Sequence, residues 1–175
     1  MELLEVIKTR QSCRKFNGEK PPIELLKEIA ELALLAPSAC NSQPWKIYLV
    51  YDDEKVKEVA KSTQDFGMNG FASKAGAFFV IADQEAKLMV GSSLKFDNNH
   101  FVKYDVGELI AYLTLICKEK GLETCILGWV NDKKLRKAVN YSEKETCNIV
   151  VAVGYSDIDV RKKSRKSADE KIIVI

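Results

Sequence analysis

The sequence predicts a single domain of the α+β class, in which helices cover a buried sheet. Residues 77–82 (AFFVIA) are a nearly continuous apolar run, which is typical of a strand covered on both faces. Apolar residues repeat at helical spacing over residues 106–120. The 175 residues contain no repeat, no low-complexity linker and no break in composition. Residues 1–175 are therefore expected to form one domain with helices on the faces of a sheet.

Five segments are expected to be helical. Residues 2–11 carry Leu3, Leu4, Val6 and Ile7 along one side. The second helix opens at residues 20–22 (KPP), since proline suits a first turn, and it stops before Pro37. The strongest pattern, 106–120, is followed by Gly121 at a position typical of a helix-ending glycine. Shorter helices are expected at 54–61 and 132–139.

Strands are expected at four places, residues 46–51, 77–82, 123–127 and 148–153, and residues 62–74 are expected to form a loop. The chain ends in an apolar run, residues 172–175, after a polar stretch. A terminal strand of this kind either covers its own domain or extends the sheet of a partner subunit. The sequence leaves both alternatives open.

Composition excludes several classes of protein. The net charge of +2 is too small to indicate nucleic-acid or membrane binding by the chain as a whole, and no run of residues is long and apolar enough to span a bilayer. Acidic Glu2 and Glu5 stand where a secretory signal would be basic, so a cytoplasmic location is expected.

The cysteines and the single histidine narrow the chemistry. Five widely spaced cysteines without a C-x-x-C pair argue against a disulfide framework and against zinc, and most are expected to be buried apolar groups. A hydrolase would have to act through His100, and no G-x-S-x-G motif is present. Hydrolysis and metal catalysis are therefore not expected.

A first polar cluster, residues 10–14 (RQSCR), follows the opening helix. Two guanidinium groups and a hydroxyl can bind a phosphate and a polar chain beside it. The alternative is a solvated helix end, where cations suit the negative end of the helix dipole. The cluster taken alone favours this alternative.

A second cluster, residues 36–45 (APSACNSQPW), joins a helix to a strand. Two prolines restrict this loop and four polar side chains lie between them, so it can be stiff and can lie flat against a planar ring. The alternative is a capped turn in which Asn41 and Ser42 satisfy local backbone groups. Trp45 is more typical of a core residue than of a ligand contact.

The third cluster is residues 161–166 (RKKSRK). Such a run is usually a solvated face and sometimes a nucleic-acid patch, but aromatic residues are not interleaved with it. The sequence lacks a Walker loop and a G-x-G-x-x-G fingerprint. A bound phosphate would therefore be held by arginine and lysine side chains from separate segments.

These clusters occur in the order and spacing of known motifs. The motif R-x-S-x-R-x-F ends at Phe16, A-P-S-x-x-N-x-Q-P-W spans 36–45, and a helix opens with Asp105 and Gly107. G-L-x-T-C-x-x-G follows at 121–128, then V-x-V-G-Y at 151–155 and K-S-R at 163–165. Over nearly its full length the chain resembles the nitroreductase family.

The resemblance implies a nitroreductase-like fold with a mixed sheet, and an intertwined homodimer that holds FMN between its subunits. The C-terminal strand would be added to the partner's sheet. The residues implied in FMN binding fall into three groups. The phosphate, the ribityl chain and the nearby pyrimidine edge would be bound by Arg10, Ser12, Arg14, Lys163 and Arg165. The opposite subunit would supply Pro37, Ser38, Ala39 and Asn41. A further contact with the pyrimidine edge has Asn69 as its nearest candidate.

The resemblance further implies that Leu127 and Gly128 face the flavin, with a backbone N–H of this stretch near N5. The flavin would carry the chemistry without a catalytic side chain: NAD(P)H would reduce it and an electron-poor acceptor, such as a nitroaromatic or a quinone, would reoxidise it by a ping-pong mechanism. The short segment between residues 82 and 105 implies a more open pocket or a narrower substrate range. The alternative is a non-enzymatic anion- or RNA-binding module that uses Arg10, Arg14 and residues 161–166.

Overall fold

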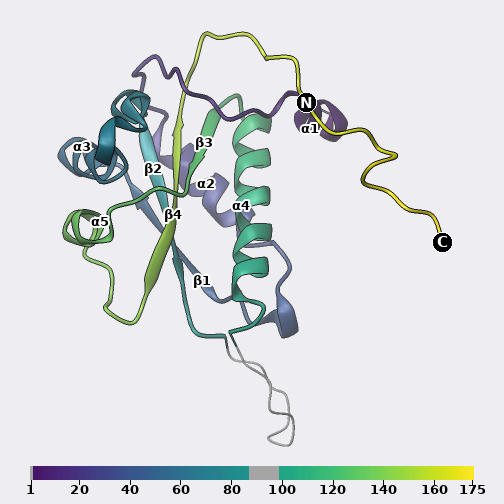
Figure 1. Ribbon diagram of the computed structural model, residues 1–175. Coiled ribbons are helices and arrows are strands. Elements are labelled where there is room, and N and C mark those ends of the chain that lie inside the picture. Colours follow the sequence, from purple (N-terminus) through teal and green to yellow (C-terminus); the bar gives the residue numbers. More distant parts are fainter. Residues whose placement is uncertain (1, 87–98) are drawn as a thin grey trace, which may run out of the picture.

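The computed structural model describes residues 2–86 and 99–175. They form three layers, in which a four-stranded sheet lies between two layers of helices (Figure 1). The strands lie in the order β1-β2-β4-β3. Their bounds are Trp45–Val50 (β1), Ala77–Asp83 (β2), Glu123–Leu127 (β3) and Thr146–Gly154 (β4). All three neighbouring pairs are antiparallel.

The expectation of a mixed sheet is corrected by this pairing. Within the described residues, parallel pairing is limited to an isolated bridge between Ser12 and Thr124. Next to it, the Cys13 N–H donates to the Thr124 carbonyl oxygen at 2.8 Å. The connections between consecutive paired strands, residues 51–76 and 128–145, return the chain in the opposite direction, whereas Ser12 reaches β3 from far away in the sequence. The bridge holds the first polar cluster at the outer edge of β3.

Helices cover both faces of the sheet, as expected for the α+β class. Their bounds are Leu3–Thr9 (α1), Ile23–Ala33 (α2), Asp53–Ser62 (α3), Val102–Glu119 (α4) and Asp132–Val139 (α5). One core lies between the sheet and α3 and α5, and the other lies between the sheet and α2 and α4. Along β2, Phe78 and Val80 face the first core while Phe79 and Ile81 face the second. The prediction that residues 77–82 are buried on both faces is confirmed.

Helix α4 is one turn longer at its start than predicted, and it ends where the glycine indicated. Gly121 has a φ of +79°, a left-handed conformation that costs glycine little. The Leu122 N–H donates to the Cys117 carbonyl at 2.8 Å and the Gly121 N–H donates to the Lys118 carbonyl at 3.1 Å. This pair of bonds is the glycine-terminated C-cap that the sequence predicted.

The region predicted as a loop, residues 62–74, contains two short 3-10 turns, Asp65–Gly67 (η2) and Gly70–Lys74 (η3). A third turn, Ala39–Asn41 (η1), lies within the second polar cluster. The brief segment expected to shape a substrate pocket falls mostly at residues 87–98, outside the described residues.

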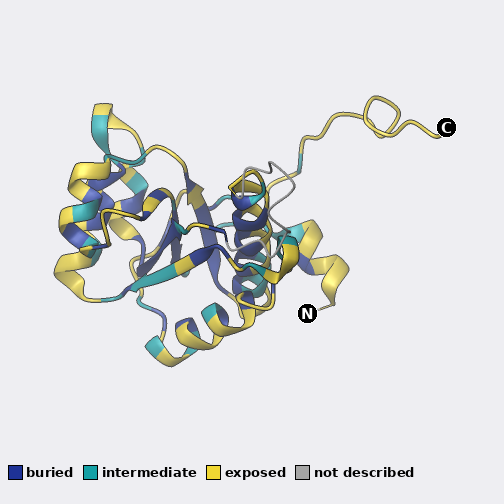
Figure 2. Cartoon of the chain, turned by 90° about the horizontal axis from the view of Figure 1, so that it is seen from below, coloured by how far each residue is buried: buried dark blue, intermediate teal, exposed yellow. Residues whose placement is uncertain are grey.

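Two apolar segments are left uncovered by their own chain. In α1 only Val6 is buried, while Leu3, Leu4 and Ile7 are exposed. Residues 172–175 are exposed, form no strand and run away from the rest of the chain (Figure 2). Of the two alternatives for this end, coverage of its own domain is therefore wrong.

Candidate functional site

The first and third polar clusters, 150 residues apart in the sequence, form one pocket of about 330 Å³. It lies where the segment after α1 meets the C-terminal segment. Among the described residues it is lined by Arg10, Gln11, Ser12, Arg14, Arg161, Lys162, Lys163, Ser164 and Arg165. Six of these nine are lysines or arginines, and none is acidic or aromatic. A pocket lined in this way attracts small anions.

The buried amide of Gln11 fastens the C-terminal segment to this site. Its Oε1 accepts hydrogen bonds from the backbone N–H and the Nε of Arg161, both at 3.1 Å, and its Nε2 donates to the Asp159 carbonyl at 3.2 Å. Arg161 also donates to the Ser12 carbonyl oxygen at 2.7 Å. Sequence reasoning did not single out Gln11 or Arg161 for this positioning role. The one available signal was that Gln11 stands between two candidate ligands.

Arg10 is the residue of the pocket whose side chain has buried nitrogens without hydrogen-bond partners among the described residues. These buried nitrogens are its Nε and one terminal nitrogen, Nη2. Burial lowers the pKa of Arg10 from its usual value, although a guanidinium remains charged at neutral pH. Buried, unpaired donors on a cation are costly unless an anion satisfies them. The residues present therefore fit a bound phosphate.

Other cations reinforce this preference. Lys163 donates to the Ile7 carbonyl oxygen at 2.7 Å. Burial lowers the pKa of Lys163, and so does repulsion from Arg165 and Arg10. An anion among these three side chains would relieve that repulsion.

The second polar cluster forms a stiff loop, as predicted. Cys40, Asn41 and Gln43 all adopt left-handed backbone conformations, with φ between 48° and 53°. The Ser38 Oγ accepts from the Gln43 N–H at 2.9 Å, and the Asn41 Oδ1 accepts from the Gln43 Nε2 at 3.1 Å. The turn is therefore capped by Ser38, whereas the capped-turn interpretation assigns this role to Asn41 and Ser42. Trp45 is buried, as expected for a core residue.

This loop does not reach the basic pocket of its own chain. The Ala39 N–H donates to the Asp105 Oδ1 at 3.1 Å, which holds the loop at the start of α4. Arg10, by contrast, acts electrostatically on Cys117, near the end of α4. Twelve residues of helix separate Asp105 from Cys117, which is about 18 Å. One chain brings the first and third clusters together and leaves Pro37, Ser38, Ala39 and Asn41 at the other end of α4.

The remaining candidates are Leu127 and Gly128, at the end of β3, and Asn69, directly before η3. Gly128 is exposed four residues after Thr124, a distance of about 13 Å along a strand from the pocket edge. A Cβ at Gly128 would meet only the Cδ1 of Ile149, at 3.9 Å. Leu127 is buried. Asn69 is half-buried and its Nδ2 donates to the Thr63 carbonyl at 2.9 Å, so in this structure its side chain serves its own loop.

Other kinds of site are not indicated by the described residues. No group of histidine, cysteine and acidic side chains among them could hold a metal ion. No helix within those residues is long and apolar enough to cross a bilayer. All five cysteines are free, and all except Cys40 are buried, which confirms the expectation that most of the thiols pack in the interior.

The fold and site thus define an α+β protein with a cationic pocket at one edge of an antiparallel sheet. A sequence model of the nitroreductase family matches residues 7–155, and the chain belongs to that family. A putative NADH dehydrogenase/NAD(P)H nitroreductase of Archaeoglobus fulgidus is 38% identical over 158 residues, which cover 88% of this chain and 85% of the relative.

The chain is also similar to a deiodinase in sequence and to an FMN-bound nitroreductase in structure. An iodotyrosine deiodinase of Thermotoga neapolitana is 26% identical over 166 residues, 89% of each chain. The crystal structure of a nitroreductase with bound FMN from Desulfitobacterium hafniense superimposes with a TM-score of 0.77 at 22% identity and covers 100% of this chain and 99% of that one. The second likeness confirms the nitroreductase-like fold.

Proposed function

We propose that the chain is an FMN-dependent oxidoreductase that passes hydride from NAD(P)H to an electron-poor acceptor such as a nitroaromatic or a quinone. The observation that carries the proposal is the basic pocket with two unpaired, buried nitrogens on Arg10. The names of the relatives from Archaeoglobus and Desulfitobacterium support the same activity and the same cofactor. A cytoplasmic location, where NAD(P)H is available, is part of the proposal.

The chain's own residues would bind and orient the cofactor. Arg10, Arg14, Lys163 and Arg165 would hold the phosphate, because guanidinium and ammonium groups bind it through charge-assisted hydrogen bonds. Ser12 would bind the ribityl chain, and the Leu127–Gly128 backbone would face the ring. Bound FMN would supply the hydride chemistry at its N5 atom. Asn69 would contact the pyrimidine edge through its Oδ1 or its second Nδ2 N–H, since one N–H is donated to the Thr63 carbonyl oxygen.

We further propose that the site is shared between two copies of the chain. Pro37, Ser38, Ala39 and Asn41 would come from the second copy, since their own pocket lies about 18 Å away along α4. The uncovered apolar side chains of α1 and the exposed residues 172–175 also favour a partner. In this proposal residues 172–175 extend the partner's sheet, and residues 1–175 of each copy form one domain.

Spectroscopy and steady-state kinetics test the proposal. The purified protein is expected to show flavin absorption and to release FMN on denaturation. It is expected to oxidise NADH or NADPH with menadione or nitrofurazone, with parallel double-reciprocal plots as for a ping-pong mechanism. Iodotyrosine belongs in the acceptor panel because of the Thermotoga relative. A colourless protein that takes up no added FMN would contradict the proposal.

The rival interpretation is an anion- or RNA-binding module built on the same basic pocket. Nucleic-acid binding would weaken steeply as salt rises, because lysine and arginine side chains that bind the phosphates displace counterions from the nucleic acid. None of the described residues that line the pocket is aromatic, so stacking with bases is not provided for within it. Tight RNA binding by a flavin-free protein would favour this alternative.

A further inference from the structure

Two aromatic side chains stand exposed beside Gly128. Phe66 is 88% exposed and Trp129, the residue directly after Gly128, is 49% exposed. Their ring centroids lie 5.8 Å apart with an edge-to-face angle of 67°. Burial of such rings is a main source of folding free energy; Phe66 forgoes most of it and Trp129 about half. Folding of the single chain therefore does not explain their position.

The backbone of Phe66 adds to this argument. Phe66 has φ 59° and ψ 28°, a left-handed conformation that is rare for a bulky L residue. Conformations of this kind persist where surrounding contacts impose them, and they gather at binding sites. The strained backbone fixes the direction in which the ring of Phe66 projects.

A polar cross-link joins the two segments that carry these rings. The Asp65 carboxylate accepts from the Nδ2 of Asn131 at 2.6 Å and also from the Nζ of Lys134. The Asn131 N–H donates to the Ser62 carbonyl oxygen at 2.7 Å. Lys134 and then Asn131 lower the pKa of Asp65, so the carboxylate is charged at neutral pH and the link is retained. Phe66 and Trp129 are thus carried by two segments that are bonded to each other.

We propose that Phe66 and Trp129 are specificity-determining residues that receive the ring of a planar acceptor next to the position of the flavin at Gly128. This inference rests on the proposed function, in which the Gly128 backbone faces the flavin. An acceptor ring can stack on one of these side chains and meet the edge of the other, which are the two favoured aromatic geometries. Asp65 is a positioning residue in this arrangement, since it acts through the two segments.

The test compares two acceptors on the FMN-loaded protein. Menadione is planar and can stack, whereas ferricyanide is compact and needs no aromatic contact. Phe66→Ala and Trp129→Ala are each expected to raise the KM for menadione about three- to tenfold, with kcat changed less. The ferricyanide rate and the FMN content are expected to stay unchanged. Phe66→Tyr and Trp129→Phe, which keep a ring, are the matched controls and should restore most of the menadione KM.

The outcomes separate this inference from the proposed function. An active wild-type protein whose alanine variants keep the wild-type KM for menadione would overturn the inference alone. Equal loss with both acceptors would overturn it too, since the rings would then support the fold or the cofactor. Conversion of the variants to monomers in sedimentation would identify the pair as a subunit contact instead. A wild-type protein without FMN would contradict the proposed function itself.

Discussion

At the scale of single residues, Arg10 is the group on which the functional assignment depends most. Its guanidinium is buried beside β3 without enough partners, and burial lowers its pKa. Arg161 shows the contrast, because its Nε donates to Gln11 and its Nη2 donates to the Ser12 carbonyl oxygen. Within one basic pocket, Arg161 therefore fastens the chain and Arg10 is left for a ligand.

Replacement of Arg10 tests that division. Arg10→Gln is expected to weaken FMN binding about 10- to 100-fold, the effect of losing a charge-assisted hydrogen bond. Riboflavin, which has no phosphate, should lose little affinity. Fluorescence titration with both flavins measures the difference. Lys133→Gln removes one positive charge from the exposed surface of α5 and serves as the control. Equal losses for FMN and riboflavin would contradict phosphate binding by Arg10.

Gly128 provides a second test at this scale. The structure has room for a Cβ there, since only Ile149 would touch it, so Gly128→Ala should leave thermal unfolding nearly unchanged. A flavin ring lying against this backbone would meet the added methyl group. We expect roughly tenfold weaker FMN binding, within the usual cost of overpacking. Unchanged affinity would argue against close approach at Gly128.

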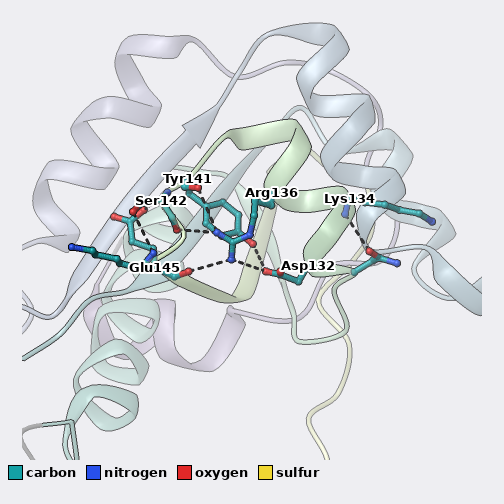
Figure 3. A network of polar contacts seen from close by, with 8 residues as sticks. Asp132, Lys134, Arg136, Tyr141, Ser142 and Glu145 are labelled. Atoms are coloured by element: carbon teal, nitrogen blue, oxygen red, sulfur yellow. Dashed lines mark hydrogen bonds and ion pairs between the residues drawn. The ribbon is translucent and has the colours of Figure 1, made fainter.

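At the scale of elements, a polar network around Arg136 and Glu145 joins α5 to the α5–β4 connection (Figure 3), and Glu145 ties that connection to Tyr48 of β1. Glu145 is buried and accepts hydrogen bonds from Tyr48, Lys46 and Gln84, and from the Ser142 N–H. Burial alone would raise its pKa, but the hydrogen bonds outweigh burial and hold the pKa below its ordinary value. The ionised form is therefore the one that stabilises this end of the sheet.

The pH dependence of unfolding follows from that direction. A carboxyl with a lowered folded-state pKa stabilises the fold above its ordinary pKa and loses this contribution as pH falls through the folded-state value. Glu145→Gln is expected to cost about 1–3 kcal/mol at neutral pH and to flatten the fall in stability between about pH 5 and pH 3. Urea unfolding at several pH values measures this, with exposed Glu143→Gln as the control. Parallel pH profiles for Glu145→Gln and the wild type would contradict it.

Elements were predictable from sequence where their signals are local. Strand β3 and helix α5 lie where the spacing placed them, and Gly121 marked the end of α4. The contacts that build the pocket were not predictable in this way. Gln11 and Arg161 are 150 residues apart, and no local pattern encodes their bond. The Ser12–Thr124 bridge is equally non-local, and no local pattern indicates how far the 36–45 loop lies from the basic pocket.

At the scale of the whole molecule, the chain leaves apolar surface that a lone copy does not cover. Leu3, Leu4 and Ile7 of α1 are exposed, and so are residues 172–175 (Figure 2). Patches of this kind mark interaction surfaces in folded proteins. The proposed homodimer would cover them and would complete the FMN site at the same time.

Removal of residues 172–175 tests the role of the chain end. We expect the shortened protein to dissociate at protein concentrations at which the full chain is dimeric, and to bind FMN more weakly as a result. Sedimentation velocity over a range of concentrations measures the first effect. The control is a full-length variant with alanine at three exposed, polar positions, Ser167, Asp169 and Glu170. An unchanged dimer would show that residues 172–175 do not hold the partner.

The most direct test of the central claim, a flavin site shared between two copies, is subunit complementation. One variant carries Arg10→Gln and Arg165→Gln, which removes phosphate binding; the other carries Ala39→Trp, which blocks the loop offered to the partner. Each alone should be dimeric and bind FMN poorly. After subunit exchange, mixed dimers contain one site with an intact pocket and an intact loop, so the account predicts recovered FMN binding and NAD(P)H oxidation. Mixed dimers that form and remain inactive would contradict it.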